Sequence, residues 1–406
     1  LASVSLIDEH NGRRVRMGQL AFAGAHSING VSALHTELMK QSVFRDLNEL
    51  YPGRINNKTN GITPRRWLLE ANPQLTALLN DAVGANVMDN ADVLVKAKRF
   101  AGDAAFQQRF AAIKRHNKEE LANLISARMG LKVDPSAMFD VHVKRIHEYK
   151  RQLLNILETI ALYNAMRAHP EKPWVPRVKI FAGKAAASYA QAKLIIKLIN
   201  DVANVVNNDP DIRDLLKVVF IPNYNVSLAE VIVPAADLSE QISTAGMEAS
   251  GTGNMKFALN GALTIGTLDG ANIEMLEHVG ADNIFIFGLT AAEVDERRRI
   301  GVDVVAILDA ARELRDVLDQ LASGVFSPGD ANRYRPIVDS ITHGDWFMVA
   351  SDFNAYASAQ RDVAKLWRRS QDWTEKTILN TVNMGWFSSD RTIREYARDI
   401  WHVPTA

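Results

Sequence analysis

The sequence predicts an α/β protein with a doubly wound parallel sheet and helical extensions. Short apolar runs bounded by turn formers recur between residues 138 and 287, which is typical of buried strands. Segments with helical spacing separate most of these runs, and this alternation favours a parallel sheet covered on both faces. The strand candidates are Met138–Val143, Val178–Phe181, Val218–Ile221, Leu238–Ile242, Leu263–Ile265 and Ile284–Phe287.

The helix candidates of this region are Glu148–Ala168, Ala187–Val206, Ser227–Ala235 and Gly253–Asn260. Residues 74–130 also have a helical pattern, with Asp89 or Asp92 as the expected N-cap. Residues 291–406 are mostly helical and end in an amphipathic helix at Arg394–Trp401.

The first sixty residues are mixed in pattern. A strand is expected near Arg14–Met17 and helical structure at Leu34–Leu50. Turn formers from Tyr51 to Asn60 predict a loop.

Composition excludes several classes of protein. The 406 residues include 47 Lys plus Arg and 47 Asp plus Glu, so a formal net charge of zero gives no support to a nucleic-acid partner. Cys is absent, which excludes disulfides and thiolate metal sites, and the histidines lack metal-ligand spacing, so no metal is expected. Neither a transmembrane run nor a secretory signal is recognisable, so we expect a cytoplasmic protein without a membrane partner.

A basic cluster follows the first predicted strand, in the run Val143–Arg151. Ligands of doubly wound sheets bind beyond the carboxyl ends of the strands, where this run lies. His147, Lys150 and Arg151 are expected on one helix face, and arginine captures phosphate with two parallel hydrogen bonds. A basic helix face is more often only solvated, so the cluster alone predicts no more than an anion site.

The run Glu248–Asn272 has the second pattern that suggests chemistry. Small residues from Ser250 to Gly253 leave backbone N–H groups uncovered before a short helix, which favours an anion. Lys256 follows between Met255 and Phe257, where lost hydration lowers the pKa of an amine and allows attack on an aldehyde. A lysine near glycines is usually exposed, so these residues alone indicate a phosphate site and no more.

This run closely resembles the cofactor-lysine segment of the α-glucan phosphorylases (glycogen, starch and maltodextrin phosphorylases). Val143–Arg151, Asn57–Trp67 and Phe22–Val31 resemble the same family, whose bacterial glycogen phosphorylases are the closest form. The resemblance covers essentially the whole chain but only the carboxyl-terminal half of a phosphorylase. Because the chain begins at Leu1 without an initiator Met, a fragment is expected.

The resemblance implies pyridoxal 5'-phosphate as cofactor and assigns it a set of residues. Lys256 would carry it covalently, and the imine would anchor it rather than act as an electron sink. The catalytic residues would be Lys144 beside the cofactor phosphate, Arg145 on the substrate phosphate and Lys150 in the same cluster. The remaining cofactor contacts would be Thr252, Gly253, Tyr224 and Trp67.

The substrate side of the site is also implied by the resemblance. The expected sugar contacts are Asn60, Tyr149, Glu248, Ser250, Gly251 and Val31. Taken alone, an Asn in a turn is a turn residue and a Trp is a core or interface residue.

The implied reaction is phosphorolysis of terminal α-1,4-linked glucose of glycogen or maltodextrin to glucose 1-phosphate. Glycosidases use two carboxylates for related chemistry, but the sequence offers no convincing pair. In the family, the cofactor phosphate exchanges protons with inorganic phosphate, and a second phosphate pKa of about 6 suits this role.

The implied architecture is the second, Rossmann-like lobe of a two-lobed GT-B glycosyltransferase fold. Residues 1–58 would be the tail of the amino-terminal lobe, 59–380 the cofactor-binding lobe, and 381–406 a terminal helical segment packing back towards the first lobe. The full-length protein would form a homodimer, and this fragment alone is expected to have little or no activity.

Two other functions remain open from the sequence. One is a nucleotide-sugar glycosyltransferase of GT-B fold, which would lack the cofactor lysine. The other is a non-catalytic binding or assembly module.

Overall fold

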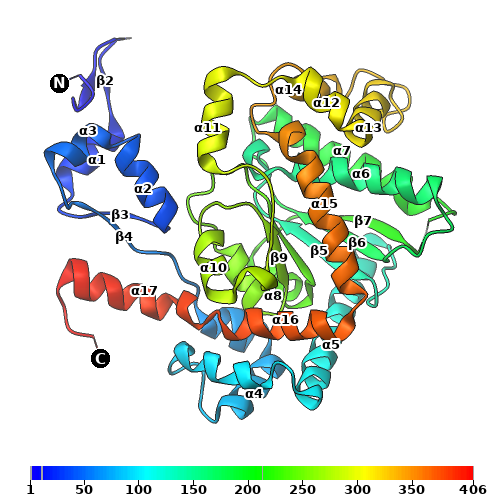
Figure 1. Cartoon of the computed structure of the whole chain (residues 1–406), viewed down its shortest axis with the longest axis horizontal. Helices are drawn as coiled ribbons and strands as arrows, with labels where there is room; N and C mark the ends of the chain where they lie inside the picture. Colours follow the sequence, from blue (N-terminus) through cyan, green and yellow to red (C-terminus); the bar gives the residue numbers. More distant parts are fainter. Residues whose placement is uncertain (1, 11, 213, 406) are drawn as a thin grey trace.

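The computed structural model describes residues 2–10, 12–212 and 214–405. Its centre is a six-stranded, entirely parallel sheet with strand order β10-β9-β8-β5-β6-β7 (Figure 1). The first strand of the sheet, β5, lies in its middle. The chain then adds β6 and β7 on one side and returns to add β8, β9 and β10 on the other. The doubly wound fold class is therefore confirmed. The strands are β5 (Met138–Val143), β6 (Arg177–Ala182), β7 (Leu216–Ile221), β8 (Leu238–Gln241), β9 (Leu263–Gly266) and β10 (Phe285–Ile286).

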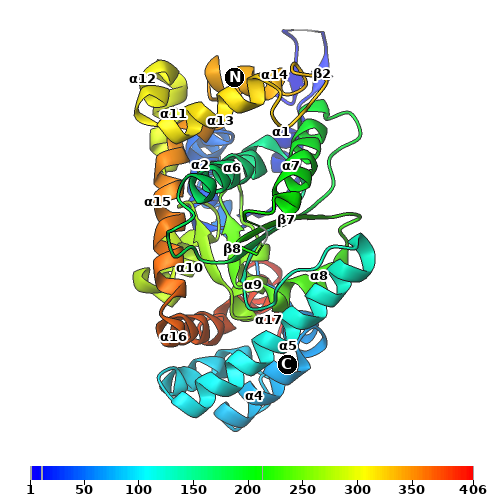
Figure 2. The same cartoon turned by 90° about the vertical axis from the view of Figure 1, so that its right-hand side faces the viewer.

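All six predicted strands are present, with small shifts at their ends. Their central members are buried along their whole length, as expected for a parallel sheet with helices on both faces. One core contains α6 (Gln152–Ala168), α7 (Ala190–Asn208) and α15 (Val349–Trp367). The opposite core contains α5 (Ala104–Met129), α8 (Val226–Ala235) and α9 (Gly253–Leu259), and Figure 2 shows the two helix layers from the side.

The helix predicted from Glu148 begins differently. Residues Glu148–Lys150 form a short 3₁₀ turn, and the α-helix begins only at Gln152. The reason is Arg151, whose left-handed backbone (φ 58°) separates the two elements.

The helical layer before the sheet consists of the π-helix η1 (Arg65–Glu70), α4 (Pro73–Val83), the 3₁₀ segment η2 (Ala91–Phe100) and α5. The predicted N-cap at Asp89 or Asp92 is wrong. Asn90 is the cap, because its side-chain oxygen accepts the Asp92 N–H. Both Asn and Asp suit an N-cap position, so residue type alone could not distinguish Asn90 from Asp89 and Asp92.

The first sixty residues form a separate layer (Figure 1). The predicted strand shrinks to β2 (Arg14–Val15), which pairs with β1 (Ile7–Asp8). The predicted helical stretch divides into α2 (Ala33–Gln41) and α3 (Arg45–Leu50). The loop predicted for residues 51–60 is partly wrong, because it contains the strand β4 (Ile55–Asn57), which pairs in parallel with β3 (Ile28–Gly30).

The carboxyl-terminal region is mostly helical, as predicted. Its last helix begins earlier than expected, because Ser388 caps α17 (Ser389–Tyr396), and a π-helical turn, η6 (Ala397–Trp401), follows. In Figure 1, α17 runs back towards the amino-terminal layer, where Tyr396 OH accepts a hydrogen bond from Asn29 Nδ2 at 2.6 Å. Across the described ranges, no helix has the length and apolar character needed to cross a membrane.

Candidate active site

The candidate site lies where the strand order reverses, beyond the carboxyl ends of β5 and β8. Lys144 directly follows β5, and the segment Ser243–Glu248 follows β8. Gly183, at the end of β6, passes so close to the Lys144 backbone that a Cβ there would lie 1.9 Å from its carbonyl oxygen. A glycine is therefore required for the neighbouring strand ends to meet at this edge of the sheet.

Lys144 and Lys150 converge on one carboxylate. Glu248 Oε2 lies 2.5 Å from Lys150 Nζ and 3.5 Å from Lys144 Nζ. Burial alone would raise the pKa of Glu248, but the two ammonium groups lower it to about 2. Burial lowers the pKa of Lys144, and Glu248 opposes that shift. The cluster is thus a cationic pair that is already partly neutralised by an internal carboxylate.

The basic run does not present one helix face, so that prediction is wrong. His147 is the N-cap of the 3₁₀ turn, and Lys150 is buried against Glu248. Arg151 is fully buried and donates to Asp352 Oδ2 at 2.6 Å and to three backbone carbonyls, so its guanidinium is structural. Arg145 is the exposed cation of the run, and its side chain makes no hydrogen bond or ion pair with the residues that the structure describes.

A small cavity opens beside the cluster. Its lining includes Lys144, Glu248, Ser250 and Gly251 from the predicted site. It also includes polar residues that the sequence reasoning did not single out, namely Gln241, Ser243, Asn254, Thr267, Asp269 and Asn272.

Asp269 and Asn272 shape this cavity. Asp269 Oδ2 accepts the N–H groups of Met247 and Glu248, and its Oδ1 lies 2.8 Å from His35 Nε2 of α2. Asn272 Nδ2 donates to the carbonyls of Gln241 and Thr267, which fixes the ends of the two neighbouring strands. Asp269 and Asn272 could have been identified from the sequence by their position after β9, at the same edge of the sheet as Lys144.

The loop Ser250–Gly253 presents unpaired donors. Within the described residues, its four backbone N–H groups donate to no protein acceptor. Gly251 has φ 74°, which turns the loop before α9, and Gly270 packs against the Glu248 and Ser250 carbonyls. This loop has the donors that an anion would use, as the sequence predicted.

Lys256 lies in the middle of α9, close to the aromatic ring of Trp67. Its Nζ is 4.1 Å from the ring centroid. Burial, followed by the nearby Arg66, lowers the pKa of Lys256, which is the shift expected of a reactive amine. The amine therefore does not point into open solvent. Asn254, two residues earlier on the same helix, lines the cavity that holds Lys144.

The remaining predicted residues come from several segments of the chain. Tyr149 is half-buried with Lys150 Nζ 4.6 Å from its ring centroid, and burial followed by Glu248 raises its pKa to about 12. Tyr224 packs against the core that contains α8 and α9, and burial raises its pKa to about 12. Asn60 N donates to Val31 O at 3.1 Å, so these two predicted sugar contacts lie side by side. Thr252 precedes α9 and accepts the Lys256 N–H through its carbonyl.

Comparison with known proteins decides the family. The family model for carbohydrate phosphorylases matches residues 1–403. The chain belongs to this family. This phosphorylase-family chain is 54% identical over 400 residues to the glycogen phosphorylase of Haemophilus influenzae, covering 98% of the chain and 49% of the relative. It is 49% identical over 403 residues to the brain form of human glycogen phosphorylase, covering 99% of the chain and 48% of the relative.

The glycogen phosphorylase of Synechocystis is similar at 51% identity over 403 residues, which is 99% of the chain and 48% of that protein. The chain thus spans about half the length of the curated relatives it matches. The resemblance read from the four sequence runs is confirmed at the level of the family.

Proposed function

We propose that this chain forms the cofactor-carrying and phosphate-binding part of a glycogen phosphorylase. The reaction would convert terminal α-1,4-linked glucose of a glucan and inorganic phosphate into glucose 1-phosphate. The observation that carries the proposal is the pairing of a shielded amine at Lys256 with an uncovered N–H loop immediately before it. Relatives named glycogen phosphorylase support the substrate class.

The residues present fit pyridoxal 5'-phosphate. Its aldehyde needs an amine of lowered pKa, and Lys256 has one. Its ring needs an apolar or aromatic neighbour, and Trp67 lies beside that amine. Its phosphate needs donors, and these are available from Thr252 and Gly253 in the loop and from Lys144. When bound, the cofactor would supply a phosphate able to exchange protons near neutral pH.

The substrate phosphate would enter beside Lys144, Lys150 and Arg145. Glu248 holds both lysines, so they would be oriented before an anion arrives. Arg145 is exposed and would reach the phosphate from outside with two parallel hydrogen bonds. An arriving dianion would compete with Glu248 for the ammonium groups, which frees the carboxylate to accept a hydrogen bond from a sugar hydroxyl.

The sugar would lie on the other side of this cluster. Glu248, Ser250 and Gly251 line the same cavity as Lys144, and they offer a carboxylate, a hydroxyl and backbone groups to glucose. We infer that Tyr149 adds a phenol, which its raised pKa keeps protonated as a donor. Asn60 would come from the chain just before η1, and Val31 from the segment between β3 and α2.

The cationic residues would stabilise the transition state of the reaction by holding the phosphate in place. A phosphate oxygen bonds to C1 as the bond from C1 to the glycosidic oxygen breaks, and that oxygen takes up the proton that the hydrogen phosphate dianion brings. The lysines and Arg145 would hold the phosphate dianion against the positive charge that develops at C1. Glucose 1-phosphate and a glucan shortened by one unit account for all atoms.

The division into 1–58, 59–380 and 381–406, and a homodimer of the full-length protein, are parts of the same proposal. The chain matches about half of each relative, so we expect activity to require the remainder of the phosphorylase.

Cofactor trapping tests the proposal. The purified chain is incubated with pyridoxal 5'-phosphate, reduced with borohydride and digested, and the modified peptide is identified by mass spectrometry. We expect modification at Lys256 in preference to exposed Lys184, and its loss in Lys256→Ala. Labelling distributed over surface lysines, or none at Lys256, would overturn the proposal and favour a binding or assembly module.

Activity is then measured with glycogen and phosphate, with the missing half supplied by a full-length relative into which this sequence is grafted. We expect glucose 1-phosphate formation, lost in the Lys256→Ala graft. Transfer from a nucleotide sugar in place of phosphorolysis would instead favour the other glycosyltransferase function.

A further inference from the structure

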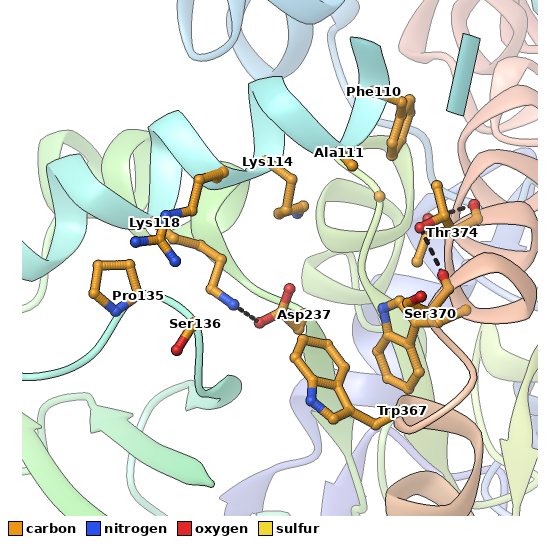
Figure 3. A pocket seen from close by; sticks show the side chains of 14 residues that line it. Phe110, Ala111, Lys114, Lys118, Pro135, Ser136, Asp237, Trp367, Ser370 and Thr374 are labelled. Atoms are coloured by element: carbon orange, nitrogen blue, oxygen red, sulfur yellow. Dashed lines mark hydrogen bonds and ion pairs between the residues drawn. The ribbon is translucent and has the colours of Figure 1, made fainter. Parts of the chain in front are cut away.

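Lys114 of α5 connects the carboxyl-terminal ends of two helices on the side of the sheet where α9 lies. Its Nζ donates to the carbonyls of Pro234 at 2.8 Å, Ala236 at 2.6 Å and Asn260 at 2.8 Å. Pro234 and Ala236 lie at the end of α8, and Asn260 is the C-cap of α9. In Figure 3, Lys114 extends from α5 above the cavity that also contains Lys118 and Asp237.

The ends of α8 and α9 need such a partner. The last carbonyls of a helix accept no hydrogen bond from within the helix, and they carry the negative end of its dipole. A cation beside them is therefore stabilising. This matters most for α9, which has only seven residues and gains little from its own hydrogen bonds.

The geometry requires the charged form of Lys114. Three carbonyl acceptors need three N–H donors, and a neutral amine has only two. Burial lowers the pKa of Lys114 to about 7, with Asp237 opposing the shift, while the three carbonyls hold the proton in place.

Asn260 links this contact to the cofactor lysine. Its backbone N–H donates to Lys256 O at 3.2 Å, and its Nδ2 donates to Lys256 O at 3.0 Å and to Trp67 O at 2.7 Å. One residue therefore binds the backbone of both Lys256 and Trp67, whose side chains are in contact. Lys114 holds the carbonyl of that same residue.

We propose that Lys114 is a positioning residue for Lys256: its ammonium fixes the end of α9 and thereby the distance between the reactive amine and the Trp67 ring. The consequence for catalysis rests on the proposed function. The positioning itself concerns only residues of this chain and can be tested without activity.

Lys118 provides the matched control. It lies one turn further along α5, is buried, and donates to Asp237 Oδ2 at 2.5 Å and to Ala137 O at 2.8 Å. Its Nζ also lies 5.1 Å from the Trp367 ring centroid. Among the described residues it makes no hydrogen bond to α9, so removing it disturbs the same cavity without releasing Lys256.

The experiment compares Lys114→Met, Lys114→Arg and Lys118→Met in the whole chain. Two quantities are measured: the pH dependence of Lys256 labelling by trace acetic anhydride, read by mass spectrometry, and hydrogen exchange of the α9 amides. We expect exchange in α9 to rise about tenfold in Lys114→Met beyond any rise in Lys118→Met, with a shifted labelling midpoint at Lys256. The Lys114→Arg variant keeps a cation and several donors, so its α9 exchange and its Lys256 labelling midpoint should both lie closer to those of the unsubstituted chain.

Equal behaviour of Lys114→Met and Lys118→Met at α9 and Lys256 would overturn the proposal. If Lys114→Met does not fold, the comparison uses Lys114→Gln, which retains two donors but no charge, and the same two outcomes apply. Cofactor trapping on the unsubstituted chain is run in parallel. Its failure would contradict the proposed function, while the labelling and exchange results would still decide the role of Lys114.

Discussion

Two lysine–carboxylate clusters lie along strand β5, and they differ in nearly every physical respect. The interior cluster, between the sheet and the helices α6 and α15, consists of Asp140, Glu158, Arg177, Lys179 and Glu240. The rim cluster, just past the carboxyl end of the strand, consists of Lys144, Arg145, Lys150 and Glu248. Only three residues lie between Asp140 and Lys144 in the sequence.

The interior cluster has its charges matched. Lys179 is fully buried, with its Nζ 2.8 Å from Asp140 Oδ2 and 3.4 Å from Glu158 Oε2. Burial, followed by Asp140, raises the pKa of Glu240 well above its ordinary value, which favours the neutral form of this carboxyl. Two cations then balance two carboxylates, and no net charge remains to attract a ligand.

The rim cluster has cationic excess. Lys144 and Lys150 face Glu248, and the exposed Arg145 adds a third cation to the run, beside an uncovered N–H loop and a cavity that a second carboxylate, Asp269, also lines. The comparison teaches that position along the strand, rather than residue type, separates structural charge from charge available to a ligand. The following predictions test that difference.

The largest effect is expected from Lys179→Met. It leaves Asp140 and Glu158 buried without their main cation, which typically costs about 3–5 kcal/mol. Urea unfolding measures the loss. The control Lys184→Met removes an exposed cation and should change the free energy of unfolding by less than about 0.5 kcal/mol. Similar losses in the two variants would remove the distinction between interior and surface charge.

Glu248→Gln should reduce stability in a pH-dependent manner. The folded pKa of Glu248, about 2, is below its ordinary value of 4.5, so its ionised form stabilises the fold above pH 4.5. The contribution is lost as pH falls from 4.5 towards 2, and at neutral pH it amounts to about 2–3 kcal/mol. Unfolding curves of the two proteins at several pH values measure it. A difference that does not shrink over that interval would contradict the lysine–carboxylate pairing.

Lys150→Met should cost less, about 1–2 kcal/mol, because Glu248 keeps Lys144 and the Ser243 hydroxyl. Affinity for inorganic phosphate, measured by isothermal titration calorimetry, should fall at the same time. A loss of stability as large as that of Lys179→Met would place Lys150 with the structural charges.

The smallest effect on stability is expected for Arg145→Ala. The side chain is exposed, so the free energy of unfolding should change by less than about 0.5 kcal/mol. Phosphate affinity should nevertheless fall about tenfold, because a charge-assisted pair of hydrogen bonds is lost. Unchanged affinity would remove Arg145 from the proposed site.

Much of the fold could be predicted from the sequence because it depends on local patterns. The strands from β5 to β10 and the helix of Lys256 follow from apolar runs, turn formers and helical spacing, which act over neighbouring residues. The basic run after β5 was wrongly read as one helix face, since the left-handed Arg151 depends on a buried partner, Asp352, about two hundred residues away. Strand β4 was missed because its pairing with β3 is equally non-local.

By itself, the sequence determined the alternation of strands and helices, the family, and the placement of Lys144 just after a strand and of Lys256 within a short helix. Only the tertiary structure decided which charges face a cavity and which are neutralised inside. It also decided that Asp269 and Asn272 hold the loop of the site and that Lys114 reaches the end of α9. The physical reason is that a charge acquires its role from burial and from its partners, and these are fixed by contacts between segments far apart in the chain.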